Sequence, residues 1–265
     1  MTTVPPSPEA GATPAPPAPA PATTGTAVAH SIGATKVYGS GDTEVHALRD
    51  VTVSFEPGRF TSIMGPSGSG KSTLMQCMAG LDRLTAGETF IENVPLSGLS
   101  DKHLTLIRRE KIGFVFQAFN LIPTLNALEN ITLPVDLAGD QVDQAWLDQV
   151  VGATGLAERL THRPNELSGG QQQRVAVARA LVSRPAIIFA DEPTGNLDSK
   201  TSAEILDFMR RAVDDLGQTI VMVTHDPFSA SHSDQVLFLS DGRIVDEMYD
   251  PTPDGVFNHI KSLGG

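Results

Sequence analysis

Cysteine is nearly absent from this 265-residue sequence, in which Cys77 is the only one. One thiol excludes an internal disulfide bond and suits a reducing compartment. Because Cys77 falls within a predicted helix, we expect a small packed side chain rather than a reactive one. Long apolar runs are also missing, since none approaches the roughly 18 residues that span a bilayer. Any role at a membrane must therefore act through a partner.

Basic residues are scarce relative to acidic ones. The sequence has 19 Lys and Arg against 31 Asp and Glu, which gives a net charge of −12. An acidic chain is a poor match to a nucleic-acid backbone, so no nucleic-acid partner is expected. The hydrophobic share of 40% is nevertheless ample for a core, and the length allows one large domain or two small ones.

The first 29 residues are built mainly from Pro, Ala and Thr, as in the stretch 14–21. Prolines at this density exclude the interiors of helices and sheets, which predicts an extended, disordered tail that acts as a spacer. The stretch lacks the basic start and the apolar centre of a secretory signal. We therefore expect the folded part of the chain to begin near His30.

A glycine-rich stretch lies between a predicted strand at 60–64 and a predicted helix that follows it. Its residues are Gly65, Pro66, Ser67, Gly68, Ser69, Gly70, Lys71 and Ser72, which fit the phosphate-loop pattern G-x-x-x-x-G-K-[ST]. Glycines let the backbone curl round a phosphate with its N–H groups pointing inward, and the helix N-terminus adds to the attraction. Lys71 could then reach the outer phosphates and Ser72 could bind Mg²⁺. A plain glycine-rich turn is the alternative, but the flanking strand and helix favour a phosphate loop.

Short strands alternate with helices along the rest of the folded part. We expect strands at 31–38, 51–56, 60–64, 88–91, 112–116, 186–190, 219–223, 235–239 and 243–246, turns at 39–42 and 241–242, and helices at 100–109 and 200–216. Residues 118–183 are mostly helical, with apolar faces at 146–151 and 175–182. Strands separated by helices imply a largely parallel sheet that is covered on both faces.

Two adjacent carboxylates, Asp191 and Glu192, follow the apolar run 187–190. The carboxyl end of a buried parallel strand is where ligands usually bind in an open α/β sheet. Beside a phosphate loop, Asp191 could hold Mg²⁺, and Glu192 could take the proton from a water that attacks the γ-phosphate. A surface Asp-Glu pair at the start of a loop is the alternative, which the phosphate loop makes less favourable.

A second anion-ready helix N-terminus is predicted at 167–171, where the sequence is Leu-Ser-Gly-Gly-Gln. Ser168 can cap the helix that follows, and Gly169 and Gly170 allow close backbone approach. An ordinary capped helix is the alternative. The residues by themselves indicate two phosphate-type sites in one chain.

Taken in order, these motifs resemble those of the ABC-type ATPases. The run 167–171 is similar to the family's signature motif, and Gln117 ends a strand as the family's Q-loop glutamine does. The Asn-Leu-Asp sequence at 196–198 resembles the D-loop, and His225 resembles the switch histidine. Tyr38 resembles the aromatic residue that stacks on adenine. The resemblance covers about residues 30–250, and the ordered set is specific although no single motif decides it.

The resemblance implies an α/β fold with three parts. They are a P-loop NTPase core with a mostly parallel sheet, an antiparallel β subdomain, and an inserted α-helical subdomain at about 118–183. The ABC ATPase domain would span residues 30–250, preceded by the tail at 1–29. A C-terminal tail at 251–265 would follow, in which Val256, Phe257 and Ile260 have the spacing of a short docking helix.

The resemblance also implies a role for each matching residue, with ATP and Mg²⁺ as the cofactors. Glu192 would be the general base, His225 would contact the γ-phosphate, and Gln117 and Asp191 would complete the surroundings of a metal bound by Ser72. The residues implied to contact nucleotide are Tyr38, Gly65, Pro66, Ser67, Gly68, Ser69, Gly70, Lys71, Ser72, Thr73, Ser168, Gly169, Gly170, Gln171 and Asp198. In this family the signature motif closes over ATP that is held by a second subunit, which implies a homodimer or a pairing with a similar ATPase subunit.

Stretches 112–123, 127–134, 163–168 and 190–199 resemble the lipoprotein-release and macrolide-efflux group of bacterial ABC ATPases. Members work with an integral membrane permease that has a large extracytoplasmic domain, so the chain is expected as a peripheral subunit on the cytoplasmic face of the plasma membrane. The region after Gln117 is where the permease would dock. Its apolar residues Phe119, Leu121 and Leu125 fit either such an interface or the core of the helical subdomain.

Three other functions compete with the transporter hypothesis. A cell-division ATPase that signals across the membrane would share every catalytic motif. A soluble ABC ATPase of DNA repair or ribosome work usually has a long coiled coil or two ATPase domains, and this sequence has neither. A generic phosphate-loop kinase or GTPase has no reason to keep the motif at 167–171. The sequence therefore favours the energy-supplying subunit of an ABC transporter, with the transported substrate left open.

Overall fold

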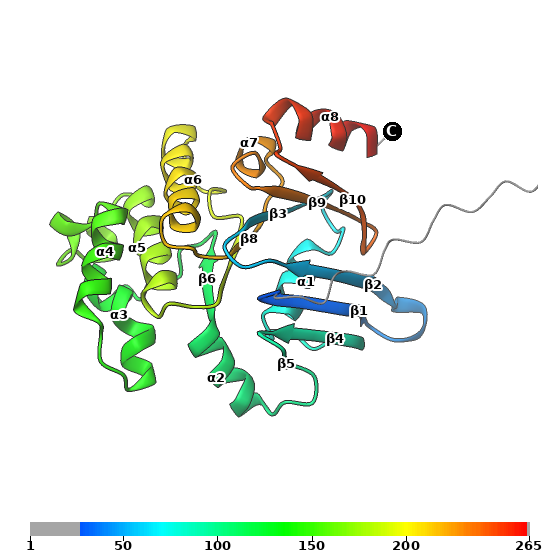
Figure 1. The fold of residues 1–265 in the computed structure, drawn as a ribbon, viewed down its shortest axis with the longest axis horizontal. Helices are drawn as coiled ribbons and strands as arrows, with labels where there is room; N and C mark the ends of the chain where they lie inside the picture. The colour runs from blue at the N-terminus through cyan, green and yellow to red at the C-terminus, as the bar shows by residue number, and fades with distance from the viewer. Residues whose placement is uncertain (1–26, 264–265) are drawn as a thin grey trace, which may run out of the picture.

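The computed structural model describes residues 27–263. Residues 1–26 of the predicted tail lie outside the described residues. Figure 1 shows helices α3, α4 and α5 gathered at one end of the molecule and the strands at the other. The three predicted parts, a parallel core, an antiparallel sheet and a helical insertion, are all present, which confirms the predicted fold class. Within residues 27–263, no helix is both long and apolar enough to span a bilayer.

The main sheet has six strands in the order β10-β9-β3-β8-β7-β6. Their bounds are β3 (Phe60–Met64), β6 (Ile112–Phe116), β7 (Ile187–Asp191), β8 (Ile220–Val223), β9 (Gln235–Ser240) and β10 (Arg243–Tyr249). All neighbouring pairs are parallel except β9 and β10, which are joined by a turn at Asp241 and Gly242 where both φ angles are positive. Every residue of β3 and of β8 is buried, as expected for strands covered on both faces.

The register of four parallel strands aligns their carboxyl ends. Ile63 of β3 pairs with Val223 of β8, Val223 pairs with Asp191 of β7, and Asp191 pairs with Phe116 of β6. Segments that are far apart in the sequence therefore end along one row. The segments that follow the ends of β3, β8, β7 and β6 contain, in that order, the phosphate loop, His225, Glu192 and Gln117.

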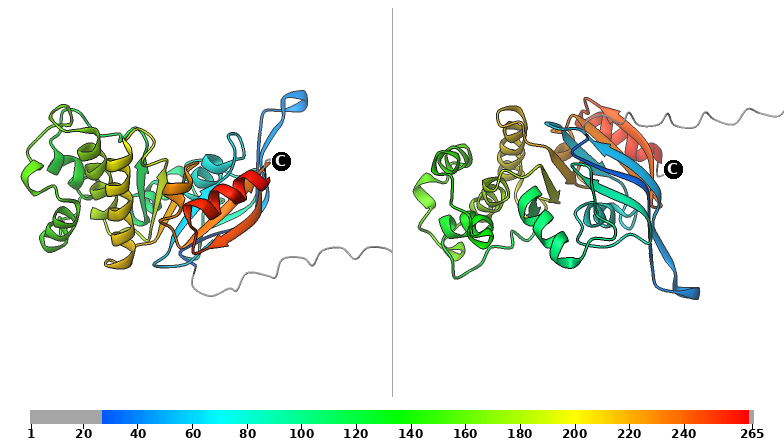
Figure 2. Two further views of the ribbon diagram at one scale, coloured as in Figure 1. Left: turned by 90° about the horizontal axis from the view of Figure 1, so that it is seen from above. Right: turned by 60° about the horizontal axis from the view of Figure 1, so that its bottom comes forward.

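The second sheet is antiparallel and has the order β2-β1-β4-β5. Its strands are β1 (Ala29–Tyr38), β2 (Val45–Phe55), β4 (Ala86–Ile91) and β5 (Val94–Pro95). The prediction that the second strand starts at residue 51 was wrong, because β2 pairs with β1 as far as Val45 opposite Tyr38. Hydrogen bonds with β1 stabilise residues 45–50 as part of a strand, although the sequence pattern of these residues indicates a strand only weakly. The connecting turn includes the 3₁₀ helix Gly41–Thr43, and Figure 2 shows the β1–β2 hairpin projecting from the body.

Eight α-helices are found within residues 27–263. They are α1 (Lys71–Met78), α2 (Asp101–Lys111), α3 (Ala127–Ala138), α4 (Gln144–Thr154), α5 (Gly169–Val182), α6 (Ser199–Asp214), α7 (Pro227–Ala230) and α8 (Pro253–Leu263), with 3₁₀ helices at Ala157–Arg159 and Pro164–Glu166. The predicted apolar faces are confirmed, since Leu147, Val150 and Val151 of α4 and Val175, Ala178, Leu181 and Val182 of α5 are buried in one core. Trp146 lies at the edge of this core and donates its indole N–H to Leu181 O at 3.1 Å.

Helix α8 packs on the body of the protein through one side. Val256 is fully buried against Met64, Val236 and Phe238, whereas Phe257 is 59% exposed. Cys77, on α1, is also buried, and burial followed by the nearby Asp82 charge raises the pKa of its thiol to about 12. A thiol in this setting stays protonated at neutral pH, which agrees with the prediction of a packed rather than a reactive side chain.

Candidate functional site

The glycine-rich loop turns sharply between β3 and α1. Gly65, Gly68 and Gly70 have φ angles of 153°, 80° and 103°, which side chains rarely adopt. A Cβ at Gly65 would overlap Leu239 O, and one at Gly70 would overlap Ala47 O. The loop geometry therefore depends on glycine at these positions. It leaves the N-terminus of α1 free to meet an anion, as expected for a phosphate loop.

Lys71 is the first residue of α1, and its ammonium lies inside the loop. Its Nζ donates to Gly65 O and to Pro66 O, each at 2.9 Å. Burial lowers the pKa of Lys71, while the carboxylates of Glu192 and Asp191 act in the opposite direction. A partly buried cation whose donors point to carbonyl oxygens fits a site for a polyanion, because phosphate oxygens are stronger acceptors.

Ser72 and Asp191 meet across the sheet edge, with 3.5 Å between Ser72 Oγ and Asp191 Oδ1. Burial and then the Glu192 charge raise the pKa of Asp191, and the Ser72 hydroxyl and Lys71 partly offset this. A hydroxyl and a carboxylate are oxygen ligands of the kind that Mg²⁺ prefers. In residues 27–263 no group of three His, Cys, Asp or Glu could hold a metal alone. The donor set therefore fits Mg²⁺ that takes its remaining ligands from phosphate and water.

Glu192 follows β7 in a backbone conformation that is unusual for a non-glycine residue, with a φ of 45°. Its N–H donates to Val223 O at 2.9 Å, which fixes the turn against the end of β8. The side chain meets His225, with 2.9 Å between Glu192 Oε1 and His225 Nδ1. Left-handed backbone at a non-glycine residue costs energy and is concentrated at functional sites. This turn aims the carboxylate at the edge where the phosphate loop lies.

Gln117 leaves the end of β6 and is bonded to the loop after β7. Its Nε2 donates to Asn196 Oδ1 at 3.3 Å, and Asn196 Nδ2 donates back to Gln117 O at 3.0 Å. A Cβ at Gly195 would lie 2.7 Å from Gln117 Nε2. Asn196 and Gly195 were not predicted as site residues, although Asn196 lies in the stretch 196–198 that resembles the D-loop and Gly195 comes directly before it. Only the folded chain brings them to Gln117.

Replacing Gly195 with alanine tests whether Gln117 must keep this position. The added methyl group would push the Gln117 amide away, because Gly195 itself cannot move while its N–H donates to Glu192 O at 3.0 Å. If Gln117 has its predicted catalytic role, we expect the rate of ATP hydrolysis to fall by about ten-fold or more, since small displacements of catalytic groups are costly. Hydrolysis is measured as phosphate release. Gly152→Ala is the matched control, since its Cβ would meet nothing within 4 Å, and equal rates in both variants would contradict the prediction.

Tyr38 ends β1 and is 40% exposed. Its hydroxyl donates to Asp82 Oδ2 at 2.6 Å, a partner that the sequence did not suggest. Asp82 follows α1 by a few residues, so the phenol is tied to the helix that begins at the phosphate loop. The Tyr38 side chain is therefore held near the C-terminal end of α1.

The residues that resemble the signature motif form a separate helix start. Ser168 Oγ accepts from Gln171 N at 3.3 Å and Gln171 Oε1 accepts from Ser168 N at 2.9 Å, a complete capping box at the N-terminus of α5. At Gly170 a Cβ would overlap Thr201 of α6. Among the described residues, no hydrogen bond or ion pair joins 168–171 to the phosphate loop. The structure does not bring these two predicted sites together within one chain.

Asp198 caps α6. Its side chain accepts from the backbone N–H groups of Lys200 and Thr201, each at 3.1 Å, and from the Thr201 hydroxyl at 2.6 Å. The Thr201 hydroxyl is the main reason why the pKa of Asp198 lies below its ordinary value. This carboxylate therefore has a local capping role, and its contact with nucleotide stays a prediction.

Comparison with known proteins decides the family. Residues 48–195 match the family described as ABC transporter. The chain is 47% identical over 220 residues to the ABC transporter ATP-binding protein MJ0796 of Methanocaldococcus jannaschii, covering 80% of this chain and 93% of that protein. This chain belongs to the ABC transporter ATP-binding family. The predicted resemblance is confirmed, and the chain is an ABC ATPase.

Other relatives of this ABC ATPase agree with the predicted subgroup. The macrolide export ATP-binding/permease protein MacB of Bdellovibrio bacteriovorus is 46% identical over 216 residues, which cover 80% of this chain and 32% of MacB. Among solved structures, the dimeric ATP-binding cassette MJ0796 bound to ADP and Pi matches with a TM-score of 0.75 and 43% identity, covering 84% of this chain and 99% of that one. CbiO1 of Clostridium perfringens matches with a TM-score of 0.76 and 26% identity, covering 91% and 94%.

Proposed function

We propose that this ABC ATPase works as one of two identical or similar subunits that drive a separate integral membrane permease. The observation that carries the proposal is the contact between the phosphate loop and the end of β7, where Ser72 Oγ lies 3.5 Å from Asp191 Oδ1 and Glu192 follows directly. In the described part of the chain, residues 168–171 at the start of α5 form no hydrogen bond or ion pair with the phosphate loop. A site that is complete except for a signature motif needs a second subunit to supply it.

Each residue at the sheet edge has a role in this proposal. The phosphates of ATP would lie on the loop N–H groups at the start of α1, where Lys71 would exchange its two carbonyl acceptors for phosphate oxygens. Glu192, oriented by its hydrogen bond with His225, would accept the proton of the attacking water. When bound between Ser72, Asp191 and Gln117, Mg²⁺ would neutralise phosphate charge.

The second subunit would supply residues 168–171 from the start of its α5. The capping box holds the first turn of that helix in place, with Ser168 exposed at its start. A solved structure of MJ0796 is described as a dimeric ABC transporter cassette, which supports this arrangement. Two head-to-tail chains would then enclose two nucleotides.

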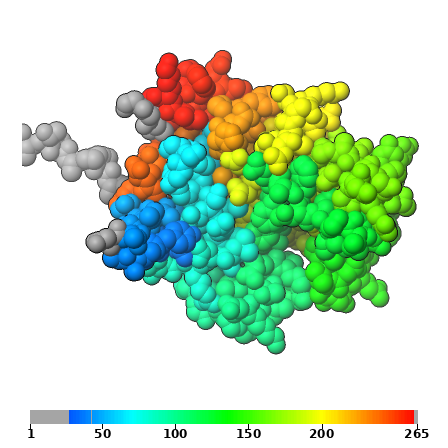
Figure 3. Space-filling model, turned by 180° about the vertical axis from the view of Figure 1, so that it is seen from behind, coloured from blue at the N-terminus to red at the C-terminus, as the bar shows by residue number. Residues whose placement is uncertain are grey.

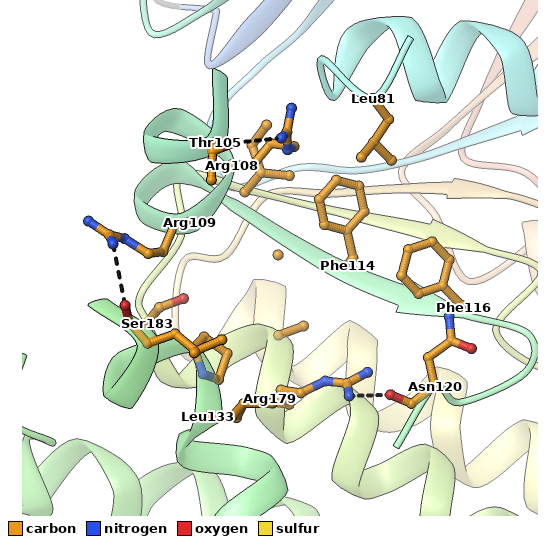
Figure 4. Close-up of a pocket in the computed structure, with 15 residues that line it drawn as sticks. Leu81, Thr105, Arg108, Arg109, Phe114, Phe116, Asn120, Leu133, Arg179 and Ser183 are labelled. Carbon is orange, nitrogen blue, oxygen red and sulfur yellow. Dashed lines mark hydrogen bonds between the residues drawn. The ribbon is translucent and has the colours of Figure 1, made fainter. Parts of the chain in front are cut away.

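A groove between α2, β6, α3 and α5 is our candidate for the permease contact. It has a volume of about 560 Å³, and its lining includes Leu81, Arg108, Phe114, Phe116, Asn120, Leu133, Leu137 and Arg179. Figure 4 shows the Phe114 and Phe116 rings side by side, with arginines on either side of them. Figure 3 shows the surface hollowed between the segment around α2 and the helical end. Of the apolar residues considered for docking, Leu121 packs against the core instead.

Charge and position indicate what the groove would hold. Arg108 donates to Gly80 O and Thr105 Oγ1, and Arg179 donates to Asn120 O and Phe119 O, so neither has a carboxylate partner among the described residues. A short permease segment with apolar and acidic side chains would match this lining. Phe116 comes directly before Gln117, and Asn120 comes three residues after it. A permease segment in the groove would therefore touch the loop that contains Gln117, which reaches the nucleotide site.

The matched part of this chain covers 32% of the Bdellovibrio MacB, whose name joins an ATP-binding protein and a permease. We propose a permease with a large extracytoplasmic domain, as in the group that the sequence resembles. That partner would hold the ATPase at the cytoplasmic face of the plasma membrane.

The function is tested by affinity purification of the Glu192→Gln chain, with ATP, from detergent-solubilised membranes of its native cells. We expect a polytopic membrane protein with a large extracytoplasmic domain to be identified by mass spectrometry. Recovery of cell-division proteins would point to signalling instead of transport. Recovery of soluble nucleic-acid or ribosomal partners alone would overturn the membrane assignment.

The groove is tested in the same experiment by Leu137→Glu. Leu137 is 69% exposed, so the charge should not disturb the core, but it would repel an acidic segment and remove apolar contact. We expect recovery of the permease to fall by about ten-fold or more, because burial of one leucine contributes roughly 1.5–3 kcal/mol. Val245→Glu on β10 is the matched control, since Val245 is 47% exposed and lies outside the groove. Equal loss in both variants, or in neither, would contradict the proposed contact.

A further inference from the structure

Three side chains from two distant segments meet at the end of β1. Tyr38 donates its hydroxyl to Asp82 Oδ2 at 2.6 Å, and Lys36 Nζ donates to Asp82 Oδ1, also at 2.6 Å. Lys36 Nζ donates further to Arg83 O at 2.7 Å and lies 4.7 Å from the centroid of the Tyr38 ring. One carboxylate therefore binds both the phenol and the cation that covers the ring.

The network holds the ring from one side and leaves the ring itself accessible. The Lys36 side chain is 12% exposed and that of Asp82 is 29% exposed, whereas Tyr38 is 40% exposed. Burial opposes ionisation of Asp82, but hydrogen bonds from Lys36, Tyr38 and the Arg83 N–H hold the pKa of this carboxyl below its ordinary value. Asp82 is therefore charged at neutral pH, and a charge-assisted bond to the phenol is stronger than a neutral one.

Asp82 also connects the ring to the phosphate loop. The backbone N–H groups of Leu81 and Asp82 both donate to Gln76 O, at 2.8 Å and 3.2 Å, so the turn after α1 is fixed to the helix. Helix α1 starts at Lys71. A short rigid helix thus separates the phosphate-binding end from the carboxylate that holds Tyr38. A nucleotide has its base and its phosphates at opposite ends, so both contacts can be set by one element.

We propose that Lys36 and Asp82 are positioning residues that hold the Tyr38 ring with one face open to the nucleobase. The inference rests on the proposed function and on the role of stacking on adenine that the family resemblance implies for Tyr38. The Lys36 ammonium occupies one face of the ring through a cation–π contact, so the base stacks on the opposite face. Because the hydroxyl is held by Asp82, the ring does not have to be ordered when ATP binds.

The test compares two ligands with and without a base, ATP and inorganic tripolyphosphate, on the full chain by calorimetry. Asp82→Ala and Tyr38→Phe each remove the hydroxyl anchor while the aromatic ring remains. We expect each to weaken ATP binding by about three- to ten-fold, the cost of ordering one side chain. Tripolyphosphate binding should change by less than about two-fold, because the phosphate loop is untouched. Combining the two changes should add little, since both break the same bond.

The matched control is Asp101→Ala. Asp101 pairs with Arg83 at 2.8 Å, its side chain is 94% exposed, and it does not touch Tyr38. We expect it to leave the ratio of the two affinities unchanged. Tyr38→Ala removes the ring, so it tests the stacking on the base separately from the positioning of the ring by Lys36 and Asp82. A loss of ATP selectivity in Tyr38→Ala but not in Asp82→Ala or Tyr38→Phe would overturn the positioning role alone. No loss of selectivity in Tyr38→Ala would overturn both the stacking and its positioning.

Discussion

Glu192→Gln is expected to reduce ATP hydrolysis by about 10²- to 10⁴-fold while ATP still binds. Glutamine keeps the size of the side chain and can still bond His225 Nδ1, which lies 2.9 Å from the carboxylate in the wild type. An amide, however, cannot take a proton from water at neutral pH. The binding groups at Lys71 and Ser72 are unchanged. The variant should therefore accumulate as an ATP-bound dimer, because a ligand that binds the dimer in preference to the monomer stabilises the dimer.

The change is measured by phosphate release, with ATP affinity and size-exclusion chromatography in ATP as companion experiments. Glu158→Gln makes the same chemical change at an exposed position on the helical end, and we expect it to behave as wild type. Near-normal turnover in Glu192→Gln would falsify the assignment of the general base. Loss of ATP binding together with turnover would instead indicate that Glu192 acts on the binding of the nucleotide.

Ser168→Arg is expected to prevent the ATP-dependent dimer and to lower hydrolysis by about 10²-fold, as when a transition-state contact is lost. Arginine would add a long charged side chain at the surface that we propose to close over the nucleotide of a second subunit. It would also remove the Oγ that accepts from Gln171 N and so loosen the first turn of α5. ATP should still bind to the phosphate loop, since no hydrogen bond or ion pair among the described residues joins that loop to α5.

The loss of the cap has to be separated from the effect on pairing. Asn126→Arg provides this control, because Asn126 forms the same capping box with Glu129 at the start of α3. Both variants lose a cap contribution of about 1 kcal/mol, but only Ser168→Arg should lose the dimer in analytical ultracentrifugation. If dimers persisted in Ser168→Arg with ATP, the motif would not act on the nucleotide of a second subunit.

Local motifs were predictable because their geometry is set by neighbouring residues. Gly65, Gly68 and Gly70 require a loop, Ser168 and Gln171 form a capping box within one turn, and buried apolar runs become strands. Most strand positions followed from the same short-range patterns, with the start of β2 as an exception. The family resemblance used the order of these motifs and needed no contacts between them.

Contacts between distant segments were not predictable in the same way. The extra length of β2 depends on its ladder with β1, and the bonds of Gln117 with Asn196 depend on how β6 and β7 pair. The anchoring of Tyr38 by Asp82 joins the end of a strand to a turn after a helix. A sequence pattern carries no information on which of many acceptors a folded chain brings to a given hydroxyl.

The sequence by itself determined the family and the phosphate loop and predicted the residues that carry the chemistry, because each is a run of neighbouring residues or an ordered set of runs. Only the tertiary structure decided that Ile63, Val223, Asp191 and Phe116 end in one row and that the loop after that row turns Glu192 toward His225. It also decided where the apolar and basic groove lies. The physical reason is strand register. Residues that are far apart in the sequence have no fixed distance from one another until hydrogen bonds between paired strands set their relative positions.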